Sequence, residues 1–133
     1  MKLYLSSYKL GNKTEVLKQW LQEHKNNKIG LIPNSRDFYS DGERKTTGLL
    51  ADSKDLQNLG FEVVILDLRD YFNRPEVLAM YLEELGGVYV VGGNTFVLRK
   101  AFKLSGFDEW VKTNYKEENF IYAGYSAGIC LLS

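Results

Sequence analysis

The strongest chemical signal in the sequence is the pentapeptide Gly124-Tyr-Ser-Ala-Gly128. It directly follows a short apolar run, 120–123, and overlaps the start of a predicted helix, Ala127–Leu132. A serine between glycines, in a sharp turn from a strand to a helix, is the nucleophile elbow of many hydrolases. The glycines relieve crowding in this turn, and the amino end of the following helix favours an oxyanion. We therefore interpret Ser126 as a nucleophile; the alternative is a plain strand-to-helix turn.

A second signal is Val90-Val-Gly-Gly-Asn-Thr-Phe96, where another apolar run passes through glycines into a predicted helix. In an open parallel sheet, both turns lie at the carboxyl edge of the strands, where ligands bind. We interpret the amides of Gly93 and Ala127 as donors to the oxyanion that forms when Ser126 attacks a carbonyl. The alternative is that Asn94 is only a helix N-cap and that the glycines only permit a tight turn. Both interpretations can hold at once. The dinucleotide pattern G-x-G-x-x-G is absent.

Short apolar runs alternate with longer helical patterns, which predicts an α/β fold with an open, mostly parallel sheet and helices on both faces. The expected strands are Lys2–Ser6, Lys28–Ile32, Phe61–Leu66, Val88–Val91 and Phe120–Ala123. The first expected helix begins at a capping box, Asn12–Glu15. The other expected helices are Gly42–Asn58, Pro75–Leu85, Thr95–Leu104 and Asp108–Tyr115. The third and fourth strands are almost continuously apolar, so we expect both to be covered on both faces.

The composition is that of one ordinary domain, residues 1–133. Lys and Arg total 17 and so do Asp and Glu, and this balance disfavours nucleic-acid and membrane-surface partners, which need a basic excess. One cysteine and one histidine supply neither a disulfide nor a Cys/His metal site, and no cofactor is predicted. No apolar run reaches the ~20 residues of a membrane span, and the start lacks a secretory pattern. We expect a cytoplasmic protein.

The segments VVGGNTF and GYSAG, in this order and spacing, resemble the dipeptidase E (aspartyl dipeptidase) and cyanophycinase family of serine peptidases. The resemblance implies a fold related to class I glutamine amidotransferases. It also implies cleavage of short peptides, including those with an N-terminal aspartate, through an acyl-enzyme. Position by position, Ser126 matches the nucleophile, Gly93 and Ala127 match the oxyanion donors, and Asn94 matches the asparagine of the glycine segment. The chain corresponds only to the front portion of a family member, so we expect a C-terminally truncated domain.

The sequence lacks the base half of such a site. Residues 127–133 contain no His, Asp or Glu, and the only histidine, His24, is expected to pack at the end of the first helix. A serine without a base is a poor nucleophile near neutral pH. Two hypotheses therefore stand. The first is a serine peptidase. The second is an inactive remnant that folds, forms a dimer with a second copy of the chain, and binds without turnover. An esterase would need an H-G-G-G segment, and a glutamine amidotransferase a cysteine at position 126.

Three further features are expected to be minor. Asn34–Asp37 follows the second strand and is predicted to overhang the same edge, with Arg36 either pairing with a substrate carboxylate or lying solvated in a loop. Asp67, Arg69 and Asp70 are interpreted as loop charges. Cys130 is interpreted as a small core residue rather than a nucleophile.

Overall fold

The computed structural model describes residues 1–6, 14–23, 26–37, 43–117 and 119–125. Their core is one five-stranded sheet with the order β1-β5-β4-β2-β3, in which every neighbouring pair is parallel. The strands are β1 (Lys2–Ser6), β2 (Lys28–Ile32), β3 (Glu62–Ile65), β4 (Gly87–Val90) and β5 (Ile121–Tyr125). The predicted parallel α/β sheet is therefore confirmed.

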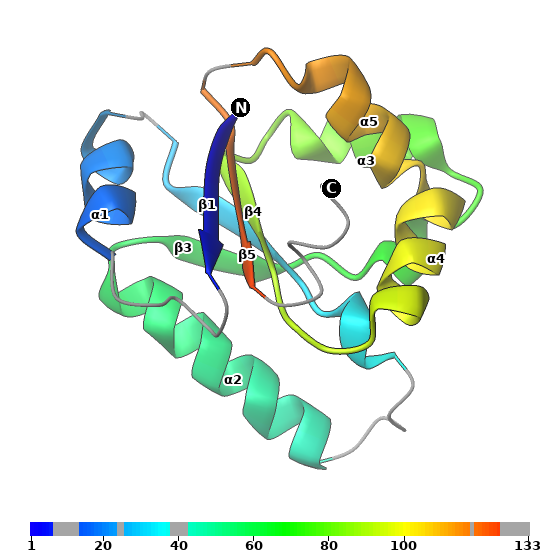
Figure 1. The fold of residues 1–133 in the computed structure, drawn as a ribbon, viewed down its shortest axis with the longest axis horizontal. Helices are drawn as coiled ribbons and strands as arrows, with labels where there is room; N and C mark the ends of the chain where they lie inside the picture. Colours follow the sequence, from blue (N-terminus) through cyan, green and yellow to red (C-terminus); the bar gives the residue numbers. More distant parts are fainter. Residues whose placement is uncertain (7–13, 24–25, 38–42, 118, 126–133) are drawn as a thin grey trace.

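Helices cover both faces of this sheet, with α1 and α2 on one face and α3, α4 and α5 on the other (Figure 1). They are α1 (Thr14–Glu23), α2 (Glu43–Asn58), α3 (Pro75–Leu82), α4 (Thr95–Ser105) and α5 (Phe107–Asn114). Two 3-10 turns, η1 (Asn34–Arg36) and η2 (Leu68–Tyr71), follow β2 and β3, where the sequence had indicated loops. None of the helices described has both the length and the apolar character that crossing a bilayer requires.

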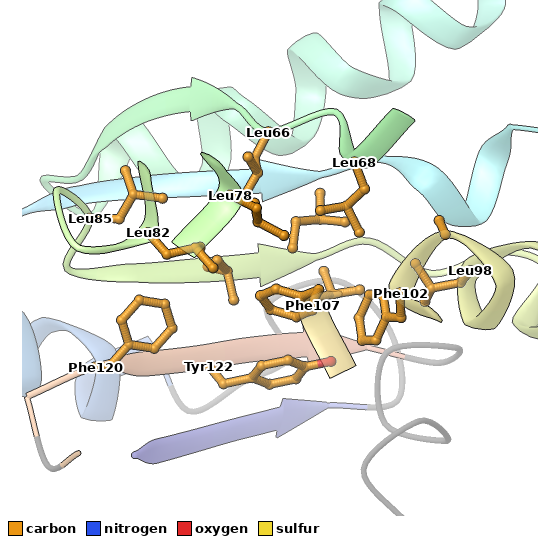
Figure 2. Close-up of a cluster of buried hydrophobic side chains, with 14 residues drawn as sticks. Leu66, Leu68, Leu78, Leu82, Leu85, Leu98, Phe102, Phe107, Phe120 and Tyr122 are labelled. Atoms are coloured by element: carbon orange, nitrogen blue, oxygen red, sulfur yellow. The ribbon is translucent and has the colours of Figure 1, made fainter. Parts of the chain in front are cut away.

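Two hydrophobic clusters hold the layers together, one on each face of the sheet. Figure 2 shows the cluster under α3, α4 and α5, where leucines pack around the rings of Phe102, Phe107, Phe120 and Tyr122. The other cluster joins α1 and α2 to the opposite face of the sheet. Strand β4 contributes to both because successive side chains of a strand point to opposite faces. All four of its residues are buried, which confirms that this strand is covered on both faces.

The same expectation holds only in part for the segment 61–66, which packs against the clusters on both faces but is not fully buried. Within the described residues β3 lies at the edge of the sheet beside β2, where its side chains have fewer neighbours, and the side chain of Ile65 is 50% exposed. The flanking residues Phe61 and Leu66 are buried. A run of aliphatic residues reports a preference for strand geometry, and it does not report how many neighbours the strand will have.

The connections that leave the carboxyl ends of β2 and β4 lead to opposite faces of the sheet. These two strands are neighbours, with Ile32 opposite Val90, yet β2 leads to α2 on one face and β4 leads to α4 on the other. In open α/β sheets, ligands bind at such a topological switch point. Strand β5 lies on the other side of β4, with Gly124 opposite Val90. The fold therefore brings the ends of three strands together at its candidate site.

Candidate active site

The turn Gly92–Asn94 joins β4 to α4 at the switch point. Asn94 is the N-cap of α4, and its side-chain oxygen accepts a hydrogen bond from the amide of Val97 at 3.1 Å, which confirms the predicted cap. Gly93 is exposed, and its N–H donates to no partner within the described part of the chain. This amide is therefore available to a ligand, as an oxyanion donor must be.

Only glycine fits at position 93. The backbone there has φ 157°, and a Cβ atom would lie 2.7 Å from the carbonyl oxygen of Ser35 and 2.9 Å from its hydroxyl oxygen. Contacts this short are not tolerated in packed protein, so a side chain would push the turn away from Ser35. The glycine is needed for close approach between two backbone segments.

Turn η1 fixes the glycine turn from the neighbouring strand. The buried hydroxyl of Ser35 donates toward the carbonyl oxygens of Val91 at 2.8 Å and Gly92 at 3.0 Å. In return, the amide of Asn94 donates to the carbonyl oxygen of Ser35 at 2.9 Å. The predicted position of 34–37 at this edge is confirmed, whereas nothing in the sequence marked Ser35 as the residue that holds the turn.

Arg36 is neither solvated nor left open for a substrate carboxylate. Its guanidinium donates to Oδ2 of Asp52 at 3.1 Å and to the hydroxyl of Tyr125 at 2.8 Å. Its side chain is 18% exposed and that of Asp52 only 1%. Gly48 of α2 leaves room for the guanidinium, because a Cβ there would lie 3.1 Å from Arg36 Nη1. The expectation of a loop arginine is wrong because η1 turns the side chain under the sheet edge toward α2.

Two buried tyrosines accompany this ion pair. The ring of Tyr125 lies 5.9 Å from that of Tyr89 on the neighbouring strand. Burial raises the pKa of Tyr89 well above its usual value, with Tyr125, Asp52 and Asp55 adding to the effect and Arg36 opposing it. Tyr89 therefore stays a neutral phenol at physiological pH.

A second polar network joins the ends of β2 and β3. The side-chain amide of buried Asn34 donates to Asp37 at 2.8 Å and to Asp67 at 2.9 Å, and its oxygen accepts the amide of Leu68 at 3.0 Å. Asp67 caps η2 and pairs with Arg69 at 2.7 Å. The interpretation of Asp67 and Arg69 as loop charges is incomplete, because Asp67 fastens η1 to the edge of the sheet through Asn34 and Arg69 pairs with Asp67, whereas Asp70 is exposed.

Asp67 gives this network a pH dependence. Burial raises the pKa of Asp67, but hydrogen bonds from Arg69 and Asn34 outweigh it, so the pKa is lowered in the folded chain. A lowered pKa stabilises the fold above the unfolded value of about 3.9, and this stabilisation is lost as the pH falls through the folded pKa. We expect Asp67→Asn to lower the free energy of unfolding at pH 7, with the difference from the unsubstituted chain shrinking below about pH 4.

Urea unfolding between pH 7 and pH 3 measures that difference. Asp70→Asn is the matched control, since Asp70 is an exposed carboxylate in the same turn. A difference for Asp67→Asn that stays constant over the whole pH range would contradict the prediction.

The remaining predicted site residues lie outside the described part of the chain: Ser126, Ala127 and His24, together with the predicted helix 127–132 and its Cys130. Ser126 directly follows Tyr125, the last residue of β5. The residues that sequence reasoning missed are Ser35, Asp52 and Tyr125, all of which act through contacts between distant elements.

The sequence model of Peptidase family S51 matches residues 3–133. A search of curated protein sequences gives no match. Among solved structures, a protein provisionally named peptidase E from Listeria monocytogenes EGD-e is 26% identical, with a TM-score of 0.69 over 96% of this chain and 60% of its own. A peptidase from an acI-B1 Actinobacterium is 18% identical, with a TM-score of 0.68 over 95% of this chain and 54% of its own.

The likeness to the actinobacterial peptidase, at 18% identity, shows the fold alone. The chain spans less than two thirds of the length of either protein. The family match, by contrast, extends over nearly the whole sequence and includes both glycine turns. It agrees with the resemblance seen in VVGGNTF and GYSAG and with the parallel sheet that carries them. The chain belongs to peptidase family S51.

Proposed function

We propose that the chain carries the nucleophile and the oxyanion donors of a serine peptidase, with Ser126 as the nucleophile. The observation that carries this proposal is the turn Gly92–Asn94, whose exposed Gly93 amide lies at the same sheet edge as the end of β5. Ser126 is the next residue after that strand. The family membership supports the same chemistry.

In the proposed reaction, the Ser126 hydroxyl attacks the carbonyl carbon of a peptide bond and its proton passes to a general base. The carbonyl oxygen becomes an oxyanion, which accepts hydrogen bonds from the amides of Gly93 and Ala127. The base returns the proton to the leaving amine as the carbon–nitrogen bond breaks, and water then hydrolyses the acyl-enzyme. The substrates that the family resemblance favours are short peptides with an N-terminal aspartate.

His24 is a poor candidate for the base. It directly follows α1, whose last residue, Glu23, pairs with Lys2 at 2.9 Å. Lys2 begins β1, so this end of α1 lies at the amino edge of the sheet, opposite to the glycine turn. A general base must come within hydrogen-bond reach of its nucleophile. We propose that the base and its acid come from outside residues 1–133, on a later segment of a longer chain or on a partner chain.

A fluorophosphonate probe tests the proposal, because it forms a covalent bond only with an activated serine. We expect the intact protein, meaning residues 1–133 together with the later segment or partner chain that supplies the base, to be labelled, and Ser126→Ala to lose all labelling. Ser105→Ala is the control, since Ser105 is a buried serine whose hydroxyl donates to the carbonyl of Phe102 within α4. Labelling that survives in Ser126→Ala would sink the proposal.

The alternative is a protein that binds peptides without turnover, and the observation in its favour is that the single histidine of residues 1–133, His24, follows α1, whose end lies at the amino edge of the sheet. Hydrolysis of aspartyl dipeptides by the intact protein separates the two functions. Release of free aspartate that depends on Ser126 supports the peptidase, and peptide binding without release supports the alternative.

A further inference from the structure

Two consecutive residues of η1 contact the glycine turn and the end of β5, the two segments that flank the proposed site. Ser35 holds the glycine turn through its hydroxyl and its carbonyl oxygen. Arg36, the next residue, donates to the hydroxyl of Tyr125, which directly precedes Ser126. The segment that carries the oxyanion donor and the strand that leads to the nucleophile are thus attached to one short turn.

This attachment spans a strand. In the sheet, β4 lies between β2 and β5, so the ends of β2 and β5 do not pair directly. The hydrogen bond from the guanidinium of Arg36 to the hydroxyl of Tyr125 therefore joins the segment after β2 to a strand that β4 separates from it. Among the described residues, this contact ties the end of β5 to η1 where the sheet itself does not pair the two segments.

The Arg36 side chain is itself fixed in place. It is held by the buried carboxylate of Asp52 on α2 and packs against Gly48 of the same helix. A planar guanidinium with two directed hydrogen bonds has little rotational freedom, which makes it a rigid spacer. Tyr125 is also confined, since it is buried against Tyr89.

We infer that η1 is a positioning turn for catalysis: Ser35 and Arg36 together hold the Gly93 turn and the end of β5, which Ser126 follows in the sequence, in a fixed relation to each other. Arg36 acts through Tyr125, so we assign it a positioning role rather than a catalytic one. The inference rests on the proposed function, because it assigns a purpose to the spacing of the two turns. Small errors in that spacing are costly, since a misplacement of about 1 Å can slow an enzymatic reaction about a hundredfold.

Tyr125→Phe tests the inference with the smallest change, because it removes the hydroxyl and keeps the ring. We expect the maximal rate of fluorophosphonate labelling to fall by about tenfold, while the probe concentration at half-maximal rate stays within about twofold. Tyr122→Phe is the matched control. It removes a buried hydroxyl from the same strand on the opposite face, and labelling should remain unchanged.

A second variant separates positioning from stability. Arg36→Met with Asp52→Leu removes both buried charges, so the fold is kept while Tyr125 loses its anchor. We expect this pair to slow labelling as much as Tyr125→Phe does, and adding Tyr125→Phe should slow it no further, because both changes break one contact. Unchanged labelling in Tyr125→Phe and in the pair, or fully additive losses, would overturn the inference.

Hydrogen exchange supplies a readout that does not depend on catalysis. Peptides covering 119–125 should exchange faster in Tyr125→Phe and in the charge-free pair than in Tyr122→Phe. If the intact protein takes no label, the proposed function fails and this comparison still decides whether η1 anchors β5. Equal exchange in all the variants would refute the anchoring.

Discussion

Replacing Gly93 with alanine is expected to lower the free energy of unfolding by about 3 kcal/mol and to slow labelling of Ser126 by about a hundredfold. The new Cβ would lie 2.7 Å from the carbonyl oxygen of Ser35. That atom is held by the amide of Asn94, so it cannot move without breaking the attachment of the glycine turn to η1. Overpacking and an unfavourable φ therefore combine, and the displaced amide no longer meets the oxyanion.

Urea unfolding and the rate of fluorophosphonate labelling measure the two effects. Thr95→Ala is the control, because it changes a side chain at the next residue after Asn94 and adds no atoms; both quantities should stay close to those of the unsubstituted chain. An alanine at position 93 that leaves stability and labelling intact would show that the close approach to Ser35 is dispensable.

The sheet could be predicted from the sequence because strand formation depends on local pattern. The predicted segments 2–6 and 28–32 coincide with β1 and β2, and the other strands differ by a residue or two at their ends. The edge position of β3 was not predictable in this way. It depends on which strands pair, and that is decided by connections among distant helices and strands rather than by the composition of one run.

In the candidate site, too, the features set by neighbouring residues could be predicted, and those set by contacts between distant residues could not. The glycine turn and the Asn94 cap are encoded within a few consecutive residues, so their roles could be predicted locally. The contacts of Arg36 reach 16 positions along the chain to Asp52 and 89 positions to Tyr125. An arginine after a strand is usually solvated, and only the packing of α2 against the sheet makes this one a buried partner.

Asp52→Leu is expected to lower the free energy of unfolding by about 3 kcal/mol, because it leaves the largely buried guanidinium of Arg36 without its carboxylate. An uncompensated charge in a low-dielectric interior costs much more than the net stabilisation that a buried ion pair provides. Adding Arg36→Met should recover most of the loss, since two apolar side chains then fill the space of the pair. Urea unfolding of the two single variants and the double variant measures this coupling. Additive losses would contradict it, because they would mean that each charge is stabilised by water or by other groups and not by its partner.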